Sequence, residues 1–310
     1  MPAQCRVCSS SELKSSTFTH LKFNWRRCYN CKSTQKDLSF DEYRDLNPTY
    51  DPGMYLPNIS SFPELRQALD VDSKMKTLST LVQGASGKKI LDVGCGMGGF
   101  LIAGRELGMD VSGYEPSAQH ASILNRLSTE TYSVINDYFS PSRSDQKYDV
   151  VLLSHVIEHI FDQRTFLQQL CDQLSEGGRL IVITPNNESL VALLTRRWWV
   201  MYKPVDHVGL IGPAAAQMMC PKGAHVLEIR TNEYAGEFAI HILSAFKSIF
   251  KPQVGGLGKK EGGAYRLQTS ENTIPKWMKS SLAIVSWFPS ALGKLLNRRA
   301  CMTVVYTKRT

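Results

Sequence analysis

The fold of this chain is decided by the stretch Ile90-Leu91-Asp92-Val93-Gly94-Cys95-Gly96-Met97-Gly98-Gly99-Phe100. A short apolar run ends in an acidic residue, passes into four glycines within six positions, and continues into an apolar-periodic segment at 100–103. This order predicts a strand, a tight turn and a helix, because glycine takes positive φ and lets another molecule approach the main chain. The N–H groups that open the helix favour a carboxylate or phosphate. We therefore expect the loop to hold a small, partly anionic cofactor.

Elements of alternating type continue around this loop. Strands are expected near 89–93, 110–115, 132–136, 148–154, 179–184 and 225–230, and a last one at Met302-Thr303-Val304-Val305-Tyr306. Helices are expected near 98–107, 117–127, 163–175 and 188–196. This alternation predicts an α/β fold with a doubly wound parallel sheet that is covered by helices on both faces. The apolar run Asp149-Val150-Val151-Leu152-Leu153 is typical of a strand buried in such a sheet.

The chain divides by composition into three parts. Residues 1–45 form a small cysteine-bearing unit, and 46–87 form a linker followed by a leading helix, with apolar residues at helical spacing from Leu65 to Val82. Residues 88–310 form the α/β domain. Within that domain we expect a lid at about 186–222 and a basic helical insertion at about 236–300.

Composition and charge restrict the class of protein. A content of 43% hydrophobic and 21% charged residues is ordinary for a soluble globular protein. No apolar run is long enough to span a membrane, and the first residues lack the apolar core of a signal peptide, so we expect a cytoplasmic protein. The net charge of +8 is concentrated in 241–310, which holds 12 Lys/Arg and two Asp/Glu. This segment is either a solvated basic face or a contact for phosphates, a nucleic acid or an anionic membrane surface.

Two cysteine pairs, Cys5-x2-Cys8 and Cys28-x2-Cys31, predict a metal site near the N-terminus. Their spacing is typical of a zinc ribbon with four thiolate ligands, whereas two disulfides are disfavoured in a chain without a signal peptide. Four protein ligands leave no open position, so this zinc would hold the fold and take no part in catalysis. Between the pairs, Trp25-Arg26-Arg27 either touches a nucleic acid or covers the strands of the ribbon.

The glycine pattern alone does not choose the cofactor, because Gly94-x-Gly96-x-x-Gly99 also satisfies the dinucleotide fingerprint. Glu115, at the end of the second strand, can accept hydrogen bonds from both ribose hydroxyls of any adenosine cofactor. Asp92 is unusual for a nicotinamide site and suits a cofactor with positive charge. Asp137, after the third strand, is placed to accept from an adenine amino group.

With these residues in place, the chain resembles the class I S-adenosylmethionine-dependent methyltransferases. The resemblance covers about 88–235 and 302–307 and rests on the glycine loop, Tyr114-Glu115-Pro116-Ser117, 148–159 and 177–186. It implies a Rossmann-like seven-stranded sheet with the order 3-2-1-4-5-7-6, in which the seventh strand is antiparallel. It also implies S-adenosylmethionine as the cofactor, with a nicotinamide dinucleotide as the alternative. The residues implied in cofactor binding are Asp92, Gly94, Gly96, Gly98, Glu115, Pro116, Asp137, Tyr138 and His155.

Methyl transfer is an in-line displacement, so the protein must mainly hold acceptor, methyl group and sulfur collinear. A base is required when the acceptor is a hydroxyl or an acidic carbon. His155, at the C-terminal end of the fourth strand, and His207, in an aromatic segment after the fifth, are the candidate catalytic residues, and His207 is the first choice as base. Glu158 and His159 are expected either to act there or to hydrogen-bond the loop backbone.

Several classes of methyl acceptor fit the sequence. A small molecule or glycan of a sugar, polysaccharide or secondary-metabolite pathway is the first choice. RNA is an alternative that the basic tail and Trp25-Arg26-Arg27 would suit. A lipid-linked or quinone-like acceptor is another, because 284–299 mixes apolar, Trp and basic residues as an interfacial segment does. A non-catalytic binding module is the remaining class, and the sequence does not decide the oligomeric state.

Overall fold

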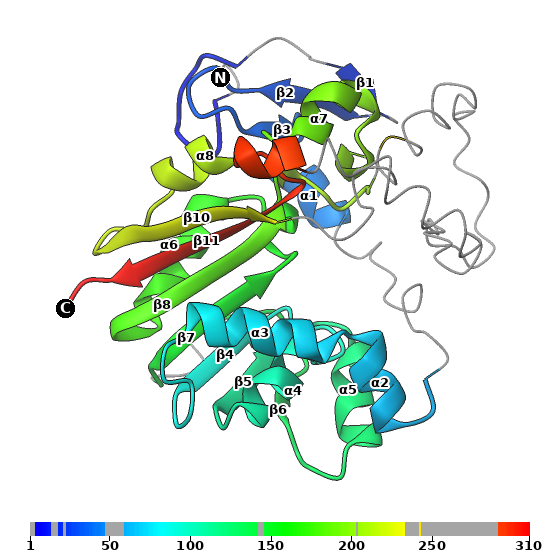
Figure 1. The fold of residues 1–310 in the computed structure, drawn as a ribbon. Coiled ribbons are helices and arrows are strands. Elements are labelled where there is room, and N and C mark those ends of the chain that lie inside the picture. Colours follow the sequence, from blue (N-terminus) through cyan, green and yellow to red (C-terminus); the bar gives the residue numbers. More distant parts are fainter. Residues whose placement is uncertain are drawn as a thin grey trace.

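The computed structural model describes residues 4–13, 18–20, 23–46, 59–141, 146–202, 204–232, 242 and 291–310. Its main feature is one large sheet (Figure 1). The strands of this sheet are β4 (Lys89–Val93), β5 (Asp110–Tyr114), β6 (Ser133–Ile135), β7 (Tyr148–Ser154), β8 (Leu174–Pro185), β10 (Ala224–Asn232) and β11 (Cys301–Lys308). The helices around it are α2 (Phe62–Ala68), α3 (Val71–Leu81), α4 (Gly99–Glu106), α5 (Ala118–Leu127), α6 (Gln163–Asp172), α7 (Leu190–Thr195) and α8 (Pro213–Met218).

The seven strands follow the order β10-β11-β8-β7-β4-β5-β6. Neighbours from β8 to β6 are parallel, and β11 is antiparallel to both β8 and β10. Numbered along the chain within this sheet and read from the β6 edge, the order is 3-2-1-4-5-7-6 with an antiparallel last strand. The predicted Rossmann-like fold is therefore confirmed.

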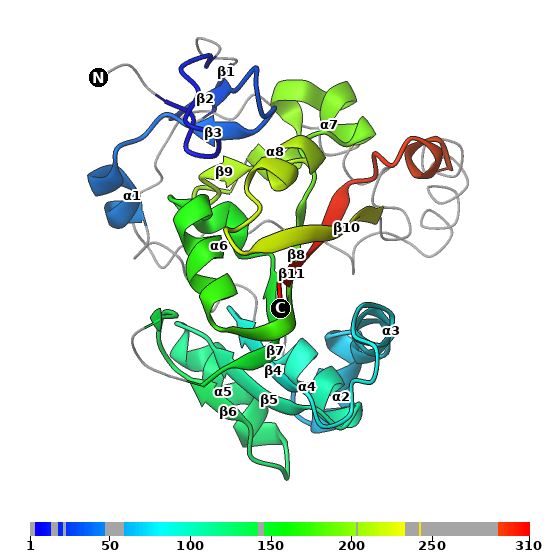
Figure 2. The same cartoon turned by 90° about the vertical axis from the view of Figure 1, so that its left-hand side faces the viewer.

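Successive side chains of β7 point to opposite faces of the sheet and are buried in two different apolar clusters. In β7, Val150 and Leu152 belong to the apolar cluster that contains residues of α3, α4 and α5. The intervening Val151 and Leu153 belong to the cluster that contains residues of α6 and α8. Figure 2 shows α6 on one side of the sheet, with α3 and α4 on the other. A strand buried on both faces needs a continuous apolar sequence, which β7 has.

The leading helix differs from the prediction. It is two helices, α2 and α3, that are separated at Asp70, whose φ of 47° lies in the left-handed region. The apolar spacing from Leu65 to Val82 is kept across this break because both helices bury apolar side chains in one cluster. A helix that the sequence did not predict, α1 (Phe40–Leu46), forms the C-terminal end of the cysteine-bearing unit.

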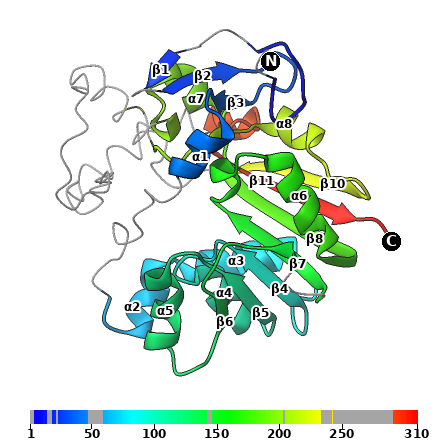
Figure 3. The same cartoon turned by 180° about the vertical axis from the view of Figure 1, so that it is seen from behind.

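A second, smaller sheet joins the N-terminal ribbon to the rest of the chain. It has the order β1-β2-β3-β9, formed by β1 (Phe18–His20), β2 (Phe23–Arg27), β3 (Thr34–Lys36) and β9 (Gly209–Leu210). The first three strands come from the ribbon, but β9 comes from the predicted lid and pairs antiparallel with β3. Figure 3 shows the ribbon strands gathered with α7 and α8, at the end of the molecule opposite α2 and α5.

Aromatic residues of the ribbon and of the predicted lid form a small core. Trp25 of β2, Trp199 and Tyr202 are buried in one cluster, with ring centroids 4.9 Å apart for Trp25 and Tyr202. Trp25 is therefore not available to stack on RNA, which was one interpretation of the segment 25–27. Arg26 of the same segment forms an ion pair with Asp37 at 2.5 Å.

Several predicted features fall outside the described residues. They include most of the linker at 46–58 and nearly all of the basic insertion at 236–300, with residues 284–290 of the predicted interfacial segment 284–299. Residues 291–295, at its end, are helical. None of the helices in the described ranges combines the length and apolar character needed to cross a membrane.

The junction between ribbon and lid can be tested at Asn187. Its buried side-chain amide donates to the carbonyl oxygens of Lys32 (2.9 Å) and Leu210 (3.1 Å) and to Oγ1 of Thr34 (3.1 Å). We expect Asn187→Ala to lower the free energy of unfolding by about 2 kcal/mol, because buried partners lose their hydrogen bonds. Urea unfolding measures this, with Gln217→Ala, an exposed amide on α8, as control. Equal stability of the two variants would contradict the assigned role of Asn187.

Candidate active site

The glycine loop between β4 and α4 has the conformation that its sequence predicts. Gly94, Gly96 and Gly98 have φ values of 74°, 55° and 87°, which L side chains rarely adopt. Close packing adds a second requirement at two of them. A Cβ on Gly94 would lie 2.5 Å from Cγ2 of Val156, and one on Gly98 would lie 2.4 Å from Cδ2 of Leu124.

Gly96 differs from its neighbours because a Cβ there would meet no atom of the described chain within 4 Å. Its N–H donates to Oε2 of Glu115 at 2.8 Å, which holds the loop against the end of β5. Neighbouring side chains therefore pack closely against the loop at Gly94 and Gly98, whereas the space beside Gly96 is free of described protein atoms. This is the arrangement expected of a cradle whose open side receives a ligand.

Glu115 is buried and is already engaged by backbone groups. Its Oε1 accepts from the N–H of Ser117 at 2.9 Å, in addition to the Gly96 contact. An ionised carboxylate has about four lone-pair sites, so each oxygen keeps capacity for a ribose hydroxyl. The side chain of Asn136, which was not among the predicted binding residues, donates to the carbonyl oxygens of Glu115 (2.9 Å) and Pro116 (3.1 Å). It thereby fixes the turn that presents Glu115.

The predicted adenine side of the site is more open. Oδ1 of Asp137 accepts from the N–H of Tyr138 at 2.7 Å, and Tyr138 is 57% exposed. The structure therefore places both residues beside Glu115 at the carboxyl ends of β5 and β6. This edge is where open α/β sheets bind ligands.

Asp92 is the most unusual carboxylate of the loop region. It is 2% exposed, and its Oδ1 has no hydrogen-bond partner among the described residues. Burial and the nearby Glu115 raise the pKa of Asp92 to about 7, against a smaller opposing effect of Lys74. A buried carboxylate without a partner is costly, so this position favours a ligand that brings a cation or a donor.

A second group of polar residues follows β7 at the same edge. His155 has a φ of 57°, a conformation that is strained for a residue other than glycine and that occurs mainly at functional sites. Its Nδ1 lies 3.3 Å from Oε1 of Glu158, and 46% of its side chain is exposed. Partial burial of the ring lowers the pKa of His155, but hydrogen bonds to the Cys301 sulfur and to Glu158 outweigh this effect and raise the pKa well above its usual value.

Glu158 is the centre of this group. It is 1% exposed in the single turn Ile157–His159, and its Oε2 accepts from Oγ1 of Thr184 at 3.0 Å. Burial opposes ionisation, but the hydrogen bond and charge of His155 lower the pKa of Glu158 to about 2. A fully buried, ionised carboxylate therefore stands at the end of β7, beside the segment whose Val156 touches the glycine loop.

The lid brings His207 to the same place. Its Nδ1 lies 2.7 Å from the carbonyl oxygen of Met201, and its ring packs edge-on against His159 with centroids 4.8 Å apart. Burial and His159 lower the pKa of His207 to about 4. Nδ1 of His159 lies 3.2 Å from Oδ2 of Asp206, and this carboxylate raises the pKa of His159 against the effect of burial.

The four ribbon cysteines also lie together. The Sγ atoms of Cys5 and Cys31 are 3.5 Å apart, those of Cys8 and Cys28 are 3.6 Å apart, and all four lie within 4.8 Å of one another. These separations are too long for disulfides but close to the roughly 3.8 Å edge of a tetrahedron with Zn–S bonds of about 2.3 Å. The donor set and spacing therefore fit a zinc ion.

Two basic residues of the ribbon, which sequence reasoning missed, hold the lid. Lys36 is buried, and its Nζ donates to the carbonyl oxygens of Pro204 (3.1 Å) and Val205 (2.5 Å), next to His207. Burial lowers the pKa of Lys36 to about 7. The guanidinium of Arg6 donates to the carbonyl oxygen of Val208 at 2.6 Å. No sequence motif marks these contacts, because they join residues about 170 to 200 positions apart.

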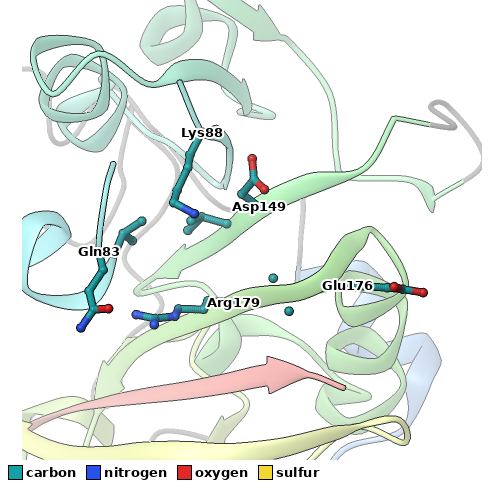
Figure 4. Close-up of a pocket in the computed structure, with 9 residues that line it drawn as sticks. Gln83, Lys88, Asp149, Glu176 and Arg179 are labelled. Atoms are coloured by element: carbon teal, nitrogen blue, oxygen red, sulfur yellow. The ribbon is translucent and has the colours of Figure 1, made fainter. Parts of the chain in front are cut away.

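A separate hollow lies at the other edge of the sheet, where β4 and β7 begin (Figure 4). Its labelled residues are Gln83, Lys88, Asp149, Glu176 and Arg179. Asp149 accepts from the N–H of Lys89, and Arg179 donates to the carbonyl oxygen of Leu81. These polar groups serve the fold, and the hollow is not part of the candidate site.

Comparisons with known proteins find methyltransferases. A model of the family "Methyltransferase domain" matches residues 66–218. The human mitochondrial ubiquinone biosynthesis O-methyltransferase is 31% identical over 222 residues, which are 67% of this chain and 56% of that protein. A ubiquinone biosynthesis O-methyltransferase of Rhodopseudomonas palustris (strain BisB18) is 28% identical over 144 residues, 45% of this chain and 51% of that protein. The chain thus spans little more than half the length of these relatives.

Solved structures give more distant likenesses. Coclaurine N-methyltransferase bound to N-methylheliamine and SAH has a TM-score of 0.48 and 13% identity, with 82% of this chain and 76% of that chain covered. At this TM-score the likeness adds nothing to the fold assignment, which the order of the sheet carries. The matched family model and this strand order together show that the chain belongs to the class I S-adenosylmethionine-dependent methyltransferases.

Proposed function

We propose that this chain transfers a methyl group from S-adenosylmethionine to a hydroxyl group of a small, quinone-like aromatic acceptor. The observation that carries the proposal is the meeting of two sites at one edge of the sheet. The open glycine loop follows β4, and the Glu158 cluster follows the adjacent β7. The names of the relatives, ubiquinone biosynthesis O-methyltransferases, favour a quinone-like acceptor over the sugar or glycan that we expected from the sequence.

The loop residues fit this cofactor. The open space at Gly96 admits a ligand against the main chain, and Glu115 keeps lone pairs for the ribose hydroxyls. Oδ1 of Asp92 would receive the amino group of the methionine part, which removes the cost of an unpaired buried carboxylate. When bound, S-adenosylmethionine supplies an electrophilic methyl group on a sulfonium. The chain must then hold the acceptor in line and remove its proton.

We assign the role of base to His155 in place of His207. The ring of His155 is partly exposed at the carboxyl end of β7, and the Glu158 carboxylate orients its Nδ1–H. Its raised pKa makes His155 the stronger base, which acts once Nε2 has released its resting proton. His207 is buried, and its low pKa makes it a weak base. Its contact with Met201 instead fixes the lid.

We also propose that the ribbon cysteines bind zinc and that this ion is structural. The spacing of the four sulfurs supports the assignment. The ribbon in turn supports the lid through Lys36, Arg6 and the β3–β9 pairing. The zinc would thus act on the reaction only by holding the acceptor side of the site in place.

The proposed reaction can be tested with labelled S-adenosylmethionine and three acceptors: a catechol that carries an isoprenoid-type side chain, a sugar nucleotide and total RNA. We expect label only in the catechol, as an aryl methyl ether. We expect His155→Ala to lower kcat by about 10²- to 10⁴-fold, because general-base catalysis is lost. His225→Ala, an exposed histidine on β10, should keep wild-type activity. Label in the sugar nucleotide or in RNA, with none in the catechol, would refute the acceptor class.

Asp92→Asn tests the cofactor assignment through stability and binding. A carboxyl whose pKa is raised on folding stabilises the fold below its unfolded pKa of 3.8 and loses that contribution as pH rises to about 7. The neutral amide should therefore be more stable than the wild type by on the order of 2 kcal/mol at about pH 8, with little difference near pH 4. Thermal unfolding at the two pH values measures this.

The same variant should bind S-adenosylmethionine about 10- to 100-fold more weakly, because a charge-assisted hydrogen bond of about 1.5–3 kcal/mol is lost. Tighter binding, or a variant that is less stable than the wild type at about pH 8, would contradict the role given to Asp92.

A further inference from the structure

His120, in the first turn of α5, is a buried imidazole whose ring forms no hydrogen bond within the described chain. The residue is 5% exposed, and both of its ring nitrogens lack a partner among the described residues. Every protonation state of an imidazole in a protein carries at least one N–H, so a buried donor is left unpaired here. Such a donor costs stability unless another group supplies its acceptor. His120 is therefore a candidate for a contact with a ligand.

The fold directs His120 toward the glycine loop. Ser117 caps α5, and its Oγ accepts from the N–H of His120 at 3.2 Å, which fixes the backbone of this residue. Residues four apart on a helix share a face, so Leu124 lies on the same side of α5 as His120. A Cβ on Gly98 would lie 2.4 Å from Cδ2 of Leu124. The face of α5 that carries His120 therefore packs against the glycine loop.

The imidazole also lies beside the carboxylate that we assign to the ribose. Nδ1 of His120 is 4.0 Å from Oε1 of Glu115, about 1 Å too far for a direct hydrogen bond. Oε1 accepts from the N–H of Ser117 and keeps one of its two lone pairs. An oxygen atom about 2.8 Å from both Nδ1 and Oε1 would subtend an angle of about 90° between them. A hydroxyl group suits this position, because it can accept from the imidazole and donate to the carboxylate at once.

We propose that His120 determines the specificity of the cofactor site by donating a hydrogen bond to one of the ribose hydroxyls that Glu115 receives. This role rests on the proposed function, in which Glu115 binds the ribose. A rotation of the ring about its Cβ–Cγ bond directs the N–H toward the shared hydroxyl. A ligand without that hydroxyl leaves both the imidazole and the carboxylate unpaired, and a site built in this way rejects such a ligand.

Calorimetric titration of the full chain with S-adenosylhomocysteine and its 2′-deoxy and 3′-deoxy analogues tests this role without a methyl acceptor. We expect the wild type to bind one of the two analogues about 10- to 100-fold more weakly than the parent compound, because buried polar groups lose their partner. His120→Leu should bind the parent about 5- to 10-fold more weakly, and should discriminate against that analogue about 5- to 10-fold less than the wild type. His120→Asn should keep most of the discrimination, because its amide can still donate. Gln119→Leu, exposed on the same helix, should behave as the wild type.

Thermal unfolding without ligand separates this role from a structural one. Replacement of an unpaired buried imidazole by an apolar side chain is expected to keep or raise the midpoint temperature, so His120→Leu should lose affinity without losing stability. Equal discrimination by the wild type and His120→Leu against both analogues, or a His120→Leu variant whose affinity falls only with its stability, would overturn the proposal. No binding of S-adenosylhomocysteine to the wild type would refute the proposed function as well, whereas binding without the difference in discrimination would refute only the role of His120.

Discussion

The site depends on one buried charge, the carboxylate of Glu158 at the end of β7. An ionised carboxylate that is only 1% exposed must be paired and hydrogen-bonded, and this requirement selects its surroundings. Oγ1 of Thr184 comes to it from β8, and the ring of His155 comes from the end of β7. Its own carbonyl oxygen accepts from the N–H of Val208 in the lid at 2.9 Å. The ends of β7 and β8 and the predicted lid therefore meet at this residue.

The same contacts explain why a ribbon belongs to this chain. Val208 follows His207 and precedes β9, and its carbonyl oxygen accepts from the backbone of Lys36 and from Arg6. Lys36 and Arg6 of the ribbon thus hold Val208 in place, and Val208 is the lid residue whose N–H donates to Glu158. A short strand such as β9 has little stability by itself, so the ribbon, with the proposed zinc bound, would supply the rigid partner. The proposed zinc site and the acceptor side of the proposed active site would in this way be parts of one structure.

Local pattern and neighbouring strands were enough to predict the central sheet and the glycine loop. The continuous apolar run at 149–153 predicts a buried strand, and the glycines at 94–98 predict a turn with positive φ. Neither prediction depends on residues elsewhere in the chain. The β3–β9 pairing and the contacts of Lys36 were not predictable, because they join segments about 170 residues apart and leave no periodic signal. The sequence also placed Glu158, His159 and His207 separately near the site. Only the packing of the lid shows that they form one cluster.

S-adenosylmethionine is expected to bind on the open side of the glycine loop, at Gly96. Calorimetric titration of the full chain with this cofactor tests it most directly, beside Gly96→Arg, whose side chain would fill the space that no described atom occupies. We expect about one cofactor bound per chain and no binding to the variant, with the fold of both intact by circular dichroism. No binding to the wild type, or equal binding to a folded Gly96→Arg, would contradict it.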